Sequence, residues 1–205
     1  MLVAERALVK QLGVREYLPT VEAMRTFTAQ RDAATPDELW LLEHPPVYTL
    51  GLAADPAHGP KLDRGIPVVQ VERGGEITYH GPGQLVMYTL VDLGRRGIKV
   101  KQFVRLLEQA VIELLGGRGE VRPGAPGVYV DGAKVAALGI RVSRGCAFHG
   151  LSLNVDMDLA PFEAIDPCGY PGLAVTQTRE LGFEFTVASA GERLAAILSG
   201  KLEHA

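Results

Sequence analysis

The sequence predicts an α/β (α+β) fold in which helices flank a mixed β-sheet. Segments with helical periodicity alternate along the chain with short segments of strand periodicity. Several of these strands follow one another through tight turns, and Asp131-Gly132 is the strongest hairpin signal among them. Strands joined by hairpins run antiparallel, so a doubly wound parallel sheet is not expected.

The size and composition favour one globular domain spanning residues 1–205. Hydrophobic residues make up 47% of the chain and charged residues 22%, which excludes a disordered tail, a collagen and a disulfide-scaffolded mini-protein. The formal charge of −3 has the wrong sign for a general nucleic-acid binder.

The chain carries no recognisable export signal, because its first residues lack a charged segment followed by an apolar run. Its apolar stretches are too short to span a bilayer. Free thiols at Cys146 and Cys168 and a cytoplasmic location are therefore expected.

Three segments have helical patterns. The first covers residues 19–33, with Thr20 as its N-cap. The clearest covers residues 100–115 and stops at two glycines, and the third covers residues 187–203 with Thr186 as its cap. The strand patterns fall at residues 38–43, 46–51, 66–72, 84–92, 127–130, 134–142 and 147–155.

The segment from Arg73 to Gln84 has four glycines among its first eleven residues and lies between two predicted strands. Glycine lets backbone N–H groups approach a ligand, and Arg73 and His80 add side-chain donors. The residues alone fit a ligand-binding loop and a turn with positive φ angles equally well. The segment matches no phosphate-binding pattern.

Two reactive side chains stand beside turns. Lys134 follows the Asp131-Gly132 turn, and is either a solvated strand end or an amine held near a site by its apolar neighbours. Cys168 lies between Pro167 and Gly169, and is either a nucleophile or a small buried hydrophobe. Since a thiol with its usual pKa is mostly protonated at pH 7, a nucleophilic Cys168 needs a base or a cation beside it.

The remaining cysteine and histidines predict no metal site. Cys146 and His149 have a spacing that matches no standard zinc pattern, so Cys146 is expected to be a packed thiol. His44 and His58 have no partner nearby in the sequence and are expected in surface or turn positions. The chain also lacks the Gly-x-Ser-x-Gly pattern of serine hydrolases.

A basic cluster lies within eleven residues and comprises Arg95, Arg96, Lys99, Lys101 and Arg105. It is either a solvated helix entry or a docking patch for an acidic protein. In the second case, replacing Arg95 and Arg96 with glutamate should raise the KM for that protein alone.

Five segments taken together resemble the lipoyl(octanoyl) transferase family, whose reaction is octanoyl-acyl carrier protein:protein N-octanoyltransfer. They occur in the family's order and are Arg73–Gln84, Pro126–Val130, Lys134–Arg141, His149–Val155 and Pro167–Tyr170. The resemblance runs from about residue 3 to the C-terminus and implies the fold of biotin and lipoate protein ligase catalytic domains.

The resemblance also implies a reaction. An octanoyl group moves from octanoyl-acyl carrier protein to an enzyme cysteine, and then to the ε-amine of a lysine on a lipoyl domain. The implied acceptors are the lipoyl domains of 2-oxoacid dehydrogenases and the glycine cleavage H protein. The thioester already carries the activation, so no ATP, metal or other cofactor is implied, and neither nucleic acid nor membrane is a partner.

The family's nucleophile corresponds to Cys168 and its activating lysine to Lys134. Its substrate-binding residues correspond to Arg73, Gly74, Gly75, Glu76, Ile77, Thr78, Tyr79, His80, Ala137, Leu138, Gly139, Gly150, Leu151 and Ser152. We add the expectation that backbone N–H groups near Gly139 or Gly150 hold the oxyanion.

Two alternatives remain. The first is an ATP-dependent ligase that adenylates free octanoate or lipoate, which would not need the thiol of Cys168. The second is a non-catalytic module that binds acyl carrier protein, which would not need Cys168 and Lys134 together.

Overall fold

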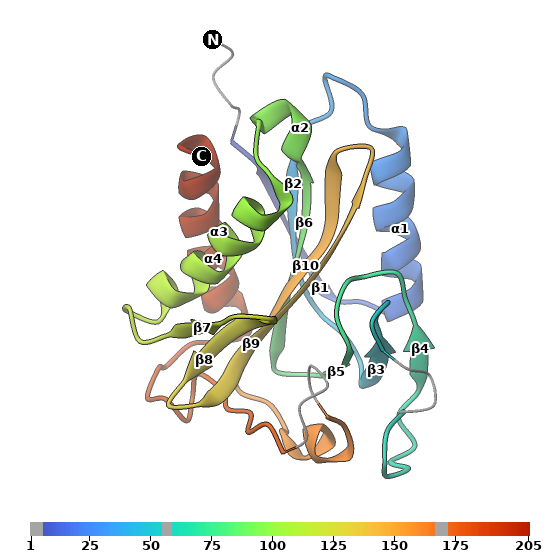
Figure 1. Ribbon diagram of the computed structural model, residues 1–205, viewed down its shortest axis with the longest axis vertical. Coiled ribbons are helices and arrows are strands. Elements are labelled where there is room, and N and C mark those ends of the chain that lie inside the picture. The colour runs from blue at the N-terminus through green and yellow to red at the C-terminus, as the bar shows by residue number, and fades with distance from the viewer. Residues whose placement is uncertain (1–5, 55–58, 167–171) are drawn as a thin grey trace.

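The computed structural model describes residues 6–54, 59–166 and 172–205, and its main element is a seven-stranded sheet (Figure 1). The strand order is β1-β2-β6-β10-β9-β8-β7. The first pair runs parallel and every later pair antiparallel, which makes the sheet mixed, as predicted. The strands are β1 (Leu8–Val14), β2 (Glu38–Glu43), β6 (Gln84–Asp92), β7 (Glu120–Arg122), β8 (Ala125–Val130), β9 (Ala133–Ser143) and β10 (Cys146–Asn154).

A second sheet has three short strands in the order β4-β3-β5. They are β3 (Val47–Leu50), β4 (Val68–Gln70) and β5 (Ile77–His80), so the glycine-rich segment contains a strand that its composition did not predict. The 3-10 helix η2 (Ala160–Ala164) packs on this sheet, where the rings of Tyr79 and Phe162 meet edge to face at 5.5 Å.

Helices cover both faces of the large sheet. The helices α3 (Val100–Leu114) and α4 (Val187–Glu203) lie on one face, and α1 (Tyr17–Gln30) lies on the other (Figure 1). Strand β6 shows the consequence, since Leu85 and Met87 join the core beneath α3 and α4 while Val86 and Tyr88 join the core beneath α1. A strand buried on both faces has no polar alternation, which explains its apolar run. No helix in the described part of the chain is long and apolar enough to cross a membrane.

The predicted boundaries hold best where the local pattern is strongest. Strands β2 and β6 and helix α4 have the predicted bounds, and Thr186 caps α4 through the N–H of Ser189. The prediction that Thr20 caps the first helix is wrong, because the helix begins at Tyr17 and the Thr20 hydroxyl donates to the Glu16 carbonyl inside its first turn.

A buried carboxylate joins three segments at one end of the sheet. Asp37 is 2% exposed and contacts the guanidinium groups of Arg31 at 2.5 Å, Arg95 at 2.8 Å and Arg96 at 2.6 Å. Burial alone would raise the pKa of Asp37, but the Asp92 N–H and the guanidinium of Arg96 hold it below its usual value. The carboxylate is therefore ionised and neutralises charges that the fold has buried.

This arrangement corrects the docking hypothesis for Arg95 and Arg96, which lie in the short helix α2 (Leu93–Arg96). The Arg96 side chain is 5% exposed and also donates to the Leu202 carbonyl at 2.9 Å. Arg95 donates to the Thr35 carbonyl at 2.9 Å. Both arginines hold the fold together, so replacing them with glutamate would disturb folding and would not isolate a docking surface.

We expect Asp37→Asn to lower the free energy of unfolding by about 3 kcal/mol or more, because it leaves buried guanidinium groups without a counter-charge. Urea unfolding followed by circular dichroism measures this loss. The matched control is Asp131→Asn, since Asp131 is exposed in a tight turn that suits Asn equally well. Equal stability of the two variants would show that Asp37 is not a structural centre.

Candidate active site

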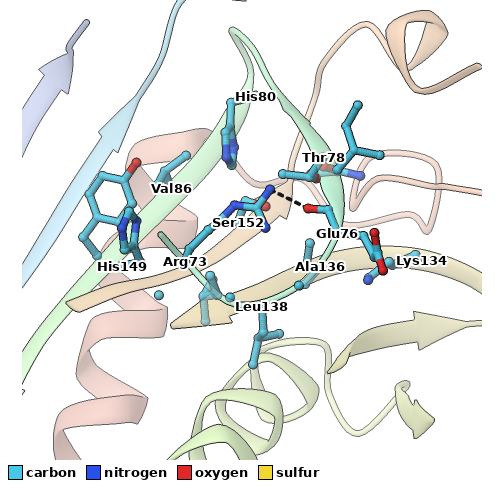
Figure 2. A pocket seen from close by; sticks show the side chains of 18 of the residues that line it. Arg73, Glu76, Thr78, His80, Val86, Lys134, Ala136, Leu138, His149 and Ser152 are labelled. Carbon is cyan, nitrogen blue, oxygen red and sulfur yellow. Dashed lines mark hydrogen bonds between the residues drawn. The ribbon is translucent and has the colours of Figure 1, made fainter. Parts of the chain in front are cut away.

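A pocket of about 730 Å³, measured out to bulk solvent, lies where the glycine-rich segment crosses strands β9 and β10 (Figure 2). The pocket's middle is apolar and includes Val86, Leu138 and Leu151. Lys134 and His149 lie at opposite ends of the labelled lining residues in Figure 2.

The register of β9 and β10 places the two short segments of the floor side by side. Gly139 pairs with Gly150, and Ala137 pairs with Ser152. A Cβ atom on Gly139 would lie 2.8 Å from the Gly74 carbonyl oxygen, and one on Gly150 would lie 2.1 Å from the Met87 carbonyl oxygen. Close backbone approach therefore requires glycine at both positions.

The same register overturns the expected oxyanion role of these glycines. The Ile140 carbonyl accepts from the Gly74 N–H at 3.1 Å, so Ile140 directs its backbone groups away from β10. Because hydrogen-bonded and non-bonded pairs alternate along antiparallel strands, the next pair, Gly139 with Gly150, exchanges its N–H groups within the sheet. Neither N–H is available to a substrate oxygen.

Arg73 is part of the glycine-rich segment and fixes its backbone through hydrogen bonds. It is 8% exposed, and its guanidinium donates to the carbonyls of Thr49 at 2.7 Å and Glu76 at 2.9 Å. Figure 2 shows the second of these bonds. A further bond joins Arg73 to the Gly74 carbonyl at 2.9 Å. The Arg73 guanidinium thus holds the backbone carbonyls of three residues in place, and one of these residues, Glu76, lines the pocket.

Lys134 is 4% exposed and lines the pocket, so it is not a solvated strand end. Its backbone N–H donates to the Ala174 carbonyl at 2.8 Å, and its carbonyl accepts from Thr176 at 3.0 Å. Phe162 and Val175, which flank residues 167–171 on the two sides, both line the pocket. Cys168 lies outside the described residues, and the chain on both sides of it borders the cavity that contains Lys134.

Three neutral histidines lie in or beside the pocket, since His80 and His149 line it and the ring of His44 lies 5.9 Å from that of His80. Burial lowers the pKa of His44 to about 4, that of His80 to about 3 and that of His149 to about 4. His44 bonds to the Tyr88 hydroxyl at 2.7 Å, and the ring of Tyr17 stacks on His80 at 5.8 Å. The expectation of a surface position for His44 is therefore wrong, and His58 lies outside the described residues.

His149 departs most from ordinary geometry. Both ring nitrogens are buried without a hydrogen-bond partner among the described residues, and the nearest carboxylate, Glu72, is 4.0 Å away. Its φ of 61° is unusual for a residue other than glycine. Cys146, at the start of the same strand, is buried as expected, and burial followed by the Asp92 carboxylate raises its pKa. The described residues contain no group of three metal-ligating side chains.

Most of the predicted substrate-binding residues line the pocket, with two exceptions. Gly74 only supports the wall through its bond to Ile140, and Tyr79 packs against Tyr48 and Phe162 in the neighbouring core. Those that line it are Arg73, Gly75, Glu76, Ile77, Thr78, His80, Ala137, Leu138, Gly139, Gly150, Leu151 and Ser152. Sequence reasoning missed Tyr17, Tyr88 and Asn154, whose only signal was a polar atom within a buried pattern.

Comparison with known proteins decides the family. The model of the lipoyl protein ligase A/B catalytic domain matches residues 16–199. An octanoyltransferase of Aromatoleum aromaticum is 59% identical over 194 residues, which cover 93% of this chain and 84% of that protein. The chain belongs to the octanoyltransferase family. Family membership makes it an acyltransferase and agrees with the resemblance inferred from its five segments.

Solved structures confirm the fold. A lipoate-protein ligase A bound with ATP superposes with a TM-score of 0.77 at 15% identity, covering 97% of this chain and 86% of that one. A biotin protein ligase from Aquifex aeolicus superposes with a TM-score of 0.57 at 12% identity, covering 98% of this chain and 71% of that one. The octanoyltransferase family thus shares the architecture of these ligases, as the sequence predicted.

We expect stability to fall between about pH 6.5 and pH 4, because the three buried histidines protonate in the unfolded chain near pH 6.5 and in the folded protein only near pH 4 or below. Each histidine contributes a slope of up to about 1.4 kcal/mol per pH unit. Urea unfolding at several pH values measures it. The slope should decrease in His44→Gln, and an unchanged slope in that variant would contradict the assignment.

Proposed function

We propose that the chain transfers an octanoyl group from octanoyl-acyl carrier protein to the ε-amine of a lysine on a lipoyl domain, through a thioester on Cys168. Octanoyl transfer in protein lipoylation is the reaction to which family membership assigns the chain. The thioester intermediate, the carrier-protein donor and the pairing of Cys168 with Lys134 are the parts that we propose. One observation carries them, namely the burial of Lys134 in the wall of an apolar pocket that the chain flanking Cys168 also borders.

The chemistry assigns successive proton transfers to Lys134. Its amine takes the thiol proton of Cys168, and the thiolate sulfur bonds to the octanoyl carbonyl carbon while the carrier's C–S bond breaks. The departing carrier sulfur takes the proton from Lys134. In the second half, the acceptor amine bonds to the carbonyl carbon and gives a proton to Lys134. The Cys168 C–S bond then breaks, and its sulfur takes that proton.

The pocket suits an acyl group with an uncharged tail. Its middle is lined by aliphatic side chains, and the histidines at its far end are neutral at pH 7. The guanidinium of Arg73 donates to the Thr49 and Glu76 carbonyls. Because its N–H groups already have these acceptors, Arg73 does not require an anionic ligand. A thiol nucleophile also needs a reducing compartment, so we place the reaction in the cytosol.

We expect both proposed protein partners to be acidic. The basic residues of the cluster that do not contact Asp37 offer them a surface. Lys99 and Lys101 are exposed at the start of α3 and have no ion-pair partner in the described part of the chain. Arg105 is exposed one turn further along the same helix. We propose that this face of α3 meets the carrier protein, while the acceptors are lipoyl domains of 2-oxoacid dehydrogenases and the glycine cleavage H protein.

We expect intact-protein mass spectrometry to find one octanoyl group added to the wild-type protein after mixing with octanoyl-acyl carrier protein and no acceptor. Hydroxylamine should release the group, because it cleaves thioesters, and Cys168→Ala should not gain it. Transfer without any adduct would contradict the thioester intermediate. Transfer of free octanoate that depends on ATP would instead support the ligase alternative.

We expect Lys99→Glu with Lys101→Glu to raise the KM for octanoyl-acyl carrier protein several-fold and to leave the turnover of a small octanoyl thioester unchanged. The reason is that the change reverses two exposed charges far from the buried site. Steady-state kinetics with both donors measures the difference. An equal loss with both donors would remove the docking role, and Glu22→Lys on the opposite face serves as a control for charge reversal.

A further inference from the structure

Helix α3 carries a carboxylate on the face that it buries. Glu108 is 7% exposed and stands among Leu107, Val111 and other apolar side chains of the core beneath the helix. A carboxylate in such surroundings is costly unless other groups compensate it. The described catalytic steps and the pocket lining do not use Glu108, so its presence requires an explanation.

The carboxylate reaches strand β8 behind the active site. Its Oε1 accepts the backbone N–H of Gly127 at 3.2 Å. Burial raises the pKa of Glu108, while the Gly127 N–H and the charges of Arg105 and Lys134 oppose that effect. Arg105 belongs to the same helix and is exposed, whereas Lys134 lies on strand β9 and is buried.

The Lys134 side chain also packs against Gly127. A Cβ atom at Gly127 would lie 2.5 Å from Lys134 Cε and 3.1 Å from Lys134 Nζ. Its φ of 148° is a second reason for glycine at this position. The ring of Tyr129, on the same strand, lies 5.5 Å from Lys134 Nζ. A chain of contacts therefore runs from the Glu108 carboxylate through Gly127 to the Lys134 amine.

We propose that Glu108 is a positioning residue for Lys134, which it serves by fixing the Gly127 backbone against the lysine and by supplying a negative charge behind the ammonium group. This inference rests on the proposed function, because it assigns Glu108 to the proton transfers of Lys134. The carboxylate charge favours the protonated form of every group near it, and its effect falls with distance. It therefore acts more strongly on Lys134 than on groups farther along the pocket.

Glu108→Gln separates the two contributions, since the amide oxygen can still accept the Gly127 N–H while the charge is lost. The readout is the rate at which iodoacetamide alkylates Cys168 as a function of pH, followed on its peptide. Cleavage after Glu163 separates the Cys168 peptide from the Cys146 peptide, and the raised pKa of Cys146 makes it slow to react. The control is Glu113→Gln, which removes a mostly exposed carboxylate from the same helix.

The Cys168–Lys134 pair loses its protons in two steps that belong to the pair. We expect both steps to move to lower pH in Glu108→Gln, by about one pH unit for the step at higher pH. The Glu113→Gln profile should coincide with that of the wild type. A Glu108→Gln profile with unchanged midpoints, or midpoints at higher pH, would overturn the proposal even if activity fell.

A second pair of variants tests the contact through Gly127. Gly127→Ala should lower the single-turnover rate of Cys168 acylation about 100-fold, because its methyl group would meet Lys134 Cε at 2.5 Å and the Ala136 carbonyl oxygen at 2.6 Å and would displace the lysine. Gly124→Ala also places a methyl group on a residue with positive φ, of 78°, but the methyl meets no atom within 4 Å, and the variant should retain most of the rate. Equal losses in the two variants would contradict the positioning role.

Lys134→Ala separates this inference from the proposed function. If Lys134→Ala changes the alkylation profile and Glu108→Gln does not, the positioning role of Glu108 fails and the Cys168–Lys134 pair stands. If Lys134→Ala leaves the profile unchanged, the pair itself is wrong, and the role of Glu108 fails with it.

Discussion

The register between β9 and β10 is the constraint on which the site depends. It places Gly139 opposite Gly150, so that two neighbouring strands lack side chains at the same level of the pocket floor. The freed space is filled by backbone, because the Gly74 and Met87 carbonyls approach these glycines too closely for any Cβ atom. A slip of one residue would turn every side chain of the floor to the other face of the sheet. The pocket floor is thus a property of the sheet, whereas Arg73, Gly75 and Glu76 of the glycine-rich segment form part of its wall.

Strand β9 joins the pocket floor to the end of the pocket that contains Lys134. β9 begins beside Lys134 and continues into Ala137 and Gly139, so the amine and the floor have one rigid backbone. The chain that follows Cys168 is fastened to this strand by the bonds of Lys134 with Ala174 and Thr176. Groups held on sheet strands keep their geometry better than groups on loops, which suits the proton transfers that we propose for Lys134.

The sequence predicted the fold class, most elements and most of the pocket lining, because these follow from local patterns. Strand β1 was missed since it lies at the sheet edge, is mostly exposed and carries a register shift near Gly13. The wrong expectation for His44 and the choice that the sequence left open for Arg95 have a different cause. Their partners, Asp37 and Tyr88, lie more than forty positions away, so no local pattern reveals whether the side chain is solvated or buried. Glu108 has a local signal, because it is a charged residue within an apolar helix face. The sequence gives no signal that its hydrogen-bond partner is Gly127 on β8.

The contacts of Asp37 with Arg31, Arg95 and Arg96 have a consequence for how the protein folds during its synthesis. Arg96 bonds both to Asp37 on the N-terminal side and to the Leu202 carbonyl in α4, so it unites segments separated by most of the chain. Contacts of such long sequence separation form late in folding. The arginines of α2 and Asp37 precede α4 in the chain and are synthesised before it, whereas the apolar face that α4 covers has no cover until α4 is made. A nascent chain of this protein therefore exposes aggregation-prone surface until its last helix emerges, and this interval is where a chaperone has most to protect.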